Sequence, residues 1–310
     1  YGIMPDWNPA EILGQAPKPL AVSLYKKLIT DDVWPKSREA LGYRAVGNNY
    51  GLISLAGRPY IDLRVSFNTL TPMCIPENLS VKLQKFYLQE LRENREFHDK
   101  IEFHVVLNCY SFNTESVNSY LTRGGFGDQE ILQIENSFRE HTNFLLKKAS
   151  DDISSIMDGP ILSISDFYSS ATKSDLTLQE RCLAGIDLCQ TNGTYNFSIL
   201  ARYAFIASSI LRDLEALGIL SSTRKHEFDR CISTTPKMLM NDLKNEDEKY
   251  LSKKYGHLRP SSYDISSKSY RDRSGIFSRS GPTQPMHTDP FQWSVQEAGS
   301  IEVLLKGHGI

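Results

Sequence analysis

Helical periodicity governs the chain from residue 128 onward, and it limits the folds that this part can adopt. After Asp128, which suits a helix N-cap, apolar side chains recur near the helical repeat to about residue 149. These side chains are Ile131, Ile134, Phe138 and Phe144 or Leu145. The same criterion predicts further helices over residues 176–190, 197–217, 223–233, 235–254 and 294–306. Amphipathic helices bury one face against each other, so this part of the chain must be a helical assembly.

The first part of the chain shows a different pattern, in which polar and apolar side chains alternate. Residues 51–68 indicate a hairpin with its turn at Gly57. The polar side of its second strand consists of Tyr60, Asp62, Arg64 and Ser66. Alternation over residues 101–107 predicts another strand of the same sheet, and helices are expected after Pro19 and over residues 77–93. The sequence therefore predicts an α+β fold, with a small antiparallel sheet in the N-terminal part followed by a mainly α-helical part.

These expected elements divide the chain into four parts. Residues 1–122 form a sheet-containing subdomain that carries the motif MPDWNPAE, and residues 123–260 form a helical subdomain that ends in YGHLRP. Residues 261–293 are rich in Ser, Arg, Gly and Pro without periodicity, which predicts a flexible loop or linker. Residues 294–310 carry the last helix.

Composition excludes several classes of protein. A chain of 310 residues with 40% hydrophobic residues can bury a sizeable core, and its net charge of -2 gives no basic field for nucleic acid. No stretch approaches the roughly 20 apolar residues of a membrane span. The five cysteines are an odd number and form no CxxC pair, so we expect reduced thiols in a cytoplasmic protein, with neither nucleic acid nor membrane as a partner.

The opening stretch MPDWNPAEI concentrates polar groups at the entry to a helix. Prolines on both sides can hold Asp6 and Glu11 in a cleft as acid/base groups, with Asn8 as a substrate contact. The alternative is local: Asp6 or Asn8 forms a turn or cap, and Trp7 anchors the core. The two interpretations are evenly matched.

The stretch YIDLRVSFN offers a second candidate site. Arg64 suits bidentate binding of a carboxylate or phosphate, and Asp62, two residues earlier on the same face of the expected strand, can orient it. An Asp–Arg pair on the solvated face of an antiparallel sheet is the alternative, and by itself this pattern favours that alternative.

The stretch KKYGHLRPSSYDI is the third candidate, because it places charged and aromatic groups directly after a helix that Gly256 closes. His257 can act as an acid/base and Arg259 as an anion contact in a turn stiffened by Pro260. Alternatively, the two cations cap the negative end of the helix dipole. Tyr263 and Asp264 follow within a few residues.

Three further kinds of chemistry, phosphate binding, metal binding and nucleophilic catalysis, have weaker support in the sequence. The glycines of RGGFGD (residues 123–128) can expose backbone amides to a phosphate, but they fit neither a P-loop nor GxGxxG, and a flexible loop is the favoured alternative. MHTDP offers His287 and Asp289 as metal ligands with no third in reach, so we expect no metal site. No nucleophile elbow is present, which leaves a free-standing hydrolase as the weakest option.

Several of these stretches occur together, in one order, in a known family. MPDWNPAEILG, PLAVSLYKKLIT, YIDLRVSFN, HDKIEF and YGHLRPSSYDI resemble the central region of phosphoenolpyruvate synthase-like, pyruvate phosphate dikinase-like phosphotransferases. YGHLRP is also similar to a stretch in the central domain of rifampicin phosphotransferases. The resemblance covers most of residues 3–265 and weakens after Tyr270.

The resemblance implies a multidomain enzyme that uses ATP and Mg²⁺, with an ATP-grasp domain and a swivelling domain whose phosphohistidine delivers phosphate to an acceptor. This chain has neither a glycine-rich ATP-grasp lid nor a carrier-histidine motif. It is therefore expected to be an internal part of a longer polypeptide, inactive and without cofactor by itself. In the longer protein we expect it to be the central, acceptor-side domain, which holds a small anionic acceptor while the swivelling phosphohistidine approaches. Its expected partners are those two domains and that acceptor. The alternative role is a non-catalytic scaffold that fixes the geometry between them.

Overall fold

The computed structural model describes residues 1–47, 51–171, 175–273, 275–277 and 290–310. It is mainly α-helical with one two-stranded antiparallel sheet near the N-terminus, which confirms the predicted α+β class. The N-terminal half contains α1 (Pro9–Leu13), α2 (Pro19–Tyr25), the π-helical turn η1 (Lys26–Thr30), α3 (Val33–Ala40), β1 (Leu52–Leu55), β2 (Arg58–Ile61), α4 (Leu63–Thr69), α5 (Glu77–Glu93), η2 (Arg95–Phe97), α6 (Ile101–His104) and α7 (Thr114–Arg123). The rest contains α8 (Asp128–Asp158), α9 (Pro160–Ala171), α10 (Leu178–Leu188), the π-helical turn η3 (Cys189–Thr194), α11 (Tyr195–Ala216), α12 (Ser222–Cys231), α13 (Thr235–Asn245), α14 (Glu248–Tyr255), η4 (Tyr270–Asp272) and α15 (Val295–His308).

The predicted hairpin is present and its turn lies at Gly57. β1 and β2 pair in antiparallel register from Leu52 opposite Ile61 to Leu55 opposite Arg58. Ala56 and Gly57 both have positive φ, 49° and 77°, as a two-residue turn between twisted strands requires. The Asp–Arg pair expected on the second strand lies beyond the hairpin.

One predicted strand, and the second half of another, are helical in the structure. After Ile61 the chain turns into α4, because the Asp62 side chain accepts a hydrogen bond from the backbone N–H of Arg64 and caps a helix. Residues 101–104 form α6, and the neighbouring residues Val105 and Val106 are both buried. The Val105 backbone N–H donates to the Ile101 carbonyl oxygen at 2.9 Å, which closes a helical turn in place of an extended strand.

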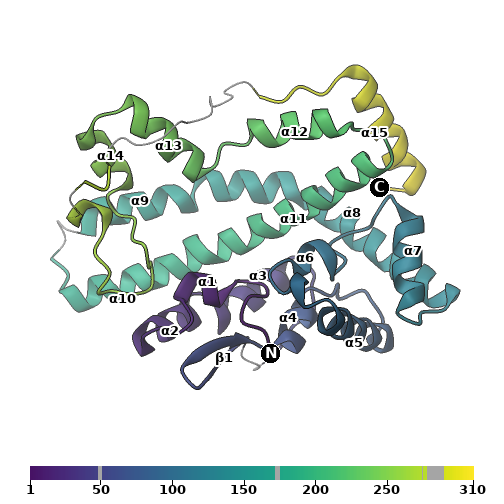
Figure 1. Cartoon of the computed structure of the whole chain (residues 1–310), viewed down its shortest axis with the longest axis horizontal. Coiled ribbons are helices and arrows are strands. Elements are labelled where there is room, and N and C mark those ends of the chain that lie inside the picture. Colours follow the sequence, from purple (N-terminus) through teal and green to yellow (C-terminus); the bar gives the residue numbers. More distant parts are fainter. Residues whose placement is uncertain (48–50, 172–174, 274, 278–289) are drawn as a thin grey trace.

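The predicted helices from residue 128 onward are present, with different ends. α8 continues to Asp158, and α9 starts at Pro160. α10, η3 and α11 follow one another without a break, so the chain forms two long rods that run side by side (Figure 1). The single helix expected over 235–254 is two helices, since the side chain of Asp247 caps α14 by accepting from Tyr250 N–H at 2.7 Å. The structure thus breaks a helix where the sequence offers a second cap.

The two π-helical turns, η1 and η3, pack against each other. The side chain of Gln190 in η3 donates to the Lys27 carbonyl oxygen at 2.6 Å, and the Thr194 hydroxyl donates to the Leu28 carbonyl oxygen at 2.6 Å. A buried hydrogen bond of 2.7 Å between the hydroxyls of Ser37 and Ser198 extends this contact to α3 and α11. The N-terminal segments are therefore fixed against the long rod of α10 and α11.

The core comprises several hydrophobic clusters. The largest draws on α4 to α8, with Leu304 and Leu305 of α15 packed against it, so it takes residues from both sides of position 122. A second cluster joins Leu41 and Tyr43 to α8 and α11, and a third joins α1, α2, η1 and α3 to the hairpin. Within the described ranges no helix has the length and apolar character needed to cross a bilayer.

Candidate functional site

Asp6, a predicted acid/base group, is buried in an ion pair with Arg38 of α3. Its two carboxylate oxygens accept from the Arg38 guanidinium at 2.6 and 3.0 Å, and the two side chains are 3% and 4% exposed. Ser66 Oγ donates to the same carboxylate at 2.6 Å, and Arg38 also donates to Thr69 Oγ1 at 2.7 Å. This carboxylate is therefore fully engaged by protein donors.

A second pair of buried charges lies near this ion pair. Glu102 of α6 is 6% exposed. Burial, followed by the negative charge of Asp6, raises the pKa of Glu102 to about 7, whereas the positive charges of Arg202 and Arg38 act in the opposite direction. The ion pair of Asp6 with Arg38, together with Glu102 and Arg202, is called the charge network, because the charges of the other three residues all act on the pKa of Glu102.

Arg202 of α11 is the least satisfied member of the charge network. Its Nη2 donates to Asn108 Oδ1 at 2.9 Å and to the Tyr43 hydroxyl at 3.3 Å, and the guanidinium lies over the Tyr43 ring. Its Nε and Nη1 are buried without a hydrogen-bond acceptor among the described residues. The side-chain amide of Asn108 also donates to the Glu102 carbonyl oxygen, so this one amide links Glu102 with Arg202.

Asn8 and Glu11 form a helix cap. The Asn8 backbone adopts a left-handed conformation, and its side-chain oxygen accepts from the Glu11 backbone N–H at 3.2 Å. The Asn8 amide donates back to the Glu11 carboxylate at 2.5 Å. This is the local arrangement that the sequence offered as the alternative to a cleft.

Asp62 and Arg64 pair with each other at the start of α4. The Arg64 guanidinium contacts the Asp62 carboxylate at 2.5 and 2.9 Å, and the hydrogen bonds from Arg64 lower the pKa of Asp62. The Arg64 side chain is 67% exposed. Both residues line a shallow hollow of about 310 Å³ with Ala45, Val46 and Asn68, so two predicted site residues share a concave surface here.

Replacement of Asp62 tests this cap. In Asp62→Ala the backbone N–H of Arg64 loses its acceptor, and we expect the free energy of unfolding to fall by about 1 kcal/mol, the usual cost of an N-cap. Urea denaturation measures the change. Asp62→Asn, which keeps an acceptor, is the matched control and should retain most of the stability. Equal losses in both variants would contradict the capping role.

His257 and Arg259 lie in the turn after α14. Arg259 donates to the backbone carbonyl oxygens of Ile265 and Ser267 at 3.3 and 3.2 Å, so it closes its own loop. Gly256 ends α14, as the sequence predicts. Neither His257 nor Arg259 is among the residues that line the hollow at Arg64.

The same loop reaches the N-terminal segments through two other residues. Tyr263 packs on Tyr25 with ring centroids 5.5 Å apart, and Asp264 forms an ion pair of 2.9 Å with Lys18 at the start of α2. The Tyr25 hydroxyl in turn donates to the Trp7 carbonyl oxygen at 3.0 Å. Folding therefore brings the N-terminal segment and the turn after α14 together. These contacts are made by Tyr263 and Asp264, and not by the predicted site residues His257 and Arg259.

The glycine-rich loop before α8 does not offer an open cradle for phosphate. The Gly127 N–H donates to the Glu130 carboxylate at 2.9 Å, and Lys82 pairs with that carboxylate at 2.5 Å. His287 and Asp289 of MHTDP lie outside the described residues. The part of the chain that the structure describes contains no group of three or more His, Cys, Asp or Glu side chains arranged to hold a metal ion.

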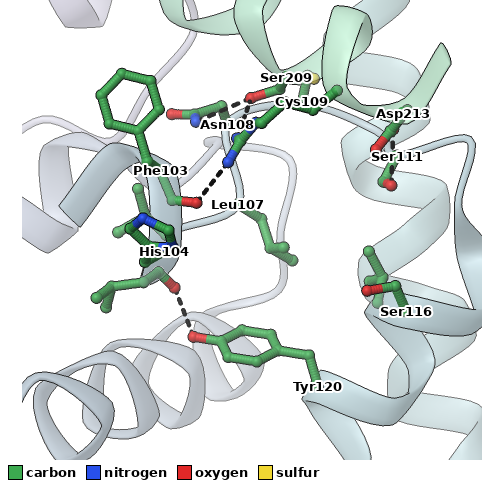
Figure 2. A pocket seen from close by; sticks show the side chains of 14 residues that line it. Phe103, His104, Leu107, Asn108, Cys109, Ser111, Ser116, Tyr120, Ser209 and Asp213 are labelled. Carbon is green, nitrogen blue, oxygen red and sulfur yellow. Dashed lines mark hydrogen bonds between the residues drawn. The ribbon is translucent and has the colours of Figure 1, made fainter. Parts of the chain in front are cut away.

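A cavity of about 260 Å³ is lined by Asn108, the residue that accepts a hydrogen bond from Arg202 (Figure 2). Its walls are the segment after α6, part of α7 and the face of α11 that carries Ser209, Arg212 and Asp213. Asp213 accepts hydrogen bonds from Ser111 Oγ and the Phe112 backbone N–H, both at 2.8 Å. Cys109 also lines the cavity, but burial raises its thiol pKa to about 12, so it stays protonated and is a poor nucleophile.

Sequence reasoning missed both this cavity and the charge network, although one signal was available. Arg202 follows Ile199 by three positions and precedes Ile206 by four, so it lies on the apolar face of α11. A charged side chain on the apolar face of a helix becomes buried, so it destabilises the fold unless it has a polar partner. Arg38 follows Trp34 by four positions in the same way. Comparisons with models of protein families, with curated proteins and with solved structures found no match for this chain.

Proposed function

We propose that this chain is the central domain of a phosphoenolpyruvate synthase-like, ATP-dependent phosphotransferase, and that it serves there as a scaffold between the ATP-grasp and swivelling phosphohistidine domains. A cytoplasmic setting fits this proposal, because all five cysteines are free thiols. ATP and Mg²⁺ would act in the other domains of that enzyme.

The meeting of the five family-like stretches supports the proposal most directly. Asp6 binds Ser66, the charge of Asp6 raises the pKa of Glu102, and Tyr263 packs on Tyr25. These residues come from all five stretches that resemble the family. The polar groups of these residues already take part in the charge network, in helix caps and in ion pairs. This favours a rigid scaffold over an open binding site.

The test of this proposal uses the longer polypeptide that it implies. Incubated with labelled ATP and Mg²⁺, that protein should acquire an acid-labile phosphohistidine, whereas residues 1–310 alone should neither take up the label nor hydrolyse ATP. Phosphoryl transfer by the isolated chain, or no phosphohistidine in the longer protein, would overturn the proposal.

A second candidate role is contact with the anionic acceptor at Arg64, because this exposed guanidinium lines the hollow beside α4. The scaffold role predicts that Arg64→Ala leaves the KM for acceptor within about twofold. The acceptor role predicts a rise of about tenfold, the loss of one charge-assisted contact. Arg58→Ala, at an exposed position of β2, is the matched control.

A further inference from the structure

The cavity of Figure 2 carries opposite charges on opposite sides. At one side the Arg212 guanidinium donates to the Phe103 carbonyl oxygen at 2.7 Å and to Ser209 Oγ at 3.2 Å. At the other side lies the carboxylate of Asp213, next to Ser111 and facing Ser116 of α7 (Figure 2). The cavity is therefore dipolar, with a cationic wall and an anionic wall.

The cationic wall has unused hydrogen-bonding capacity. Arg212 Nε is buried and has no acceptor among the described residues. Burial, and to a smaller extent the positive charges of Arg212 and Lys100, lower the pKa of His104, which lines the same wall. An anionic group placed here would gain both a donor and a favourable potential.

The anionic wall also has capacity to spare. A carboxylate can accept about four hydrogen bonds. Asp213 accepts the two from Ser111 and Phe112. Burial raises its pKa, although these two bonds, the charge of Arg212 and the backbone N–H of Asn113 all act in the opposite direction. No arginine or lysine forms an ion pair with it among the described residues. A cationic donor would therefore stabilise its ionised form.

We propose that this cavity binds a small zwitterion of the free α-amino acid class, with its ammonium group at Asp213 and its carboxylate at Arg212. The size fits, since about 260 Å³ is room for roughly nine waters at about 30 Å³ each. A ligand with one charge satisfies only one wall and leaves the other unpaired. Amino acid binding in this cavity does not depend on phosphoryl transfer, so its absence would leave the proposed function unaffected.

Calorimetric titration of residues 1–310 tests the charge requirement. L-alanine should bind saturably at millimolar concentration. Propionate, which lacks its amino group, and ethylamine, which lacks its carboxylate, should each bind at least tenfold more weakly. Equal binding of the three compounds would overturn the proposal. So would the absence of binding by both L-alanine and L-serine, which is tested as a second amino acid.

Two variants locate the binding. Ser116 is exposed on α7, so Ser116→Leu should block the cavity without disturbing the fold and should abolish L-alanine binding. Ser119→Leu, exposed on the same helix but outside the cavity, is the matched control and should bind normally. Asp213→Asn keeps an acceptor for Phe112 but loses the charge, and should weaken binding at least tenfold. Normal binding by Ser116→Leu would contradict the assignment even if Asp213→Asn failed to fold.

Discussion

Asp6→Asn should lower the free energy of unfolding by about 3–5 kcal/mol, the cost of leaving a buried charge without its partner. Arg38, 4% exposed, would keep its guanidinium charge opposite a neutral amide. The backbone at residue 6 has φ of 62°, a conformation that asparagine adopts readily, so the replacement adds no strain there. The measurement is the shift of the urea midpoint at constant pH.

Two further variants separate the charge effect from other causes. Asp6→Asn combined with Arg38→Met should lose less stability than the sum of the single replacements, since the double variant buries no unpaired ion. Glu302→Gln breaks an ion pair with Lys306 whose side chains are 66% and 74% exposed, and should leave the midpoint almost unchanged. An Asp6→Asn midpoint as close to wild type as that of Glu302→Gln would refute the role of the charge network.

Glu102→Gln should remove a pH dependence from stability. The folded-state pKa of Glu102, about 7, lies above its ordinary value of 4.5 because burial disfavours the charged form. The folded chain therefore binds one more proton than the unfolded chain between pH 4.5 and 7, and stability falls as pH rises through this window. At about 1.4 kcal/mol per unit, wild type should lose about 3 kcal/mol relative to Glu102→Gln.

Urea denaturation of both proteins at half-unit steps from pH 4.5 to 8 measures this difference. Wild type and Glu102→Gln should be closest in stability at the acid end and furthest apart above pH 7. Glu96→Gln, at an exposed position in η2, is the control and should follow wild type throughout. A constant offset between wild type and Glu102→Gln across the range would show that Glu102 ionises normally in the folded protein.

The predictable part of the fold was the part decided by local periodicity and caps. α5 spans Glu77–Glu93 as expected, and the hairpin turn falls at Gly57. α4 was misread because its alternating sequence satisfies a strand equally well, and only the cap at Asp62 decides for a helix. Single helices that the sequence suggested were divided where a second cap was present, as at Asp247.

The candidate site was less predictable because it depends on contacts between distant segments. Asp6 was predicted as an acid/base group, and in the structure it is buried against Arg38, which lies 32 positions away with no local pattern to connect the two. Asn8 and Glu11 were equally compatible with a cleft or a cap until the backbone direction was known. The cavity at Asp213 arises from three segments, and none of them carries a recognisable motif.

The paired π-turns show where this chain can change its length. Each such turn holds one residue more than an α-helical turn, so the extra residue is absorbed locally and the helices on either side keep their phase. Loss of one residue at η3 would close an ordinary α-helical turn and leave the apolar face of α11 on its partners, while the local bond of Thr194 to the Leu28 carbonyl oxygen would be lost. A one-residue deletion should therefore be tolerated better at η3 than in the middle of α11.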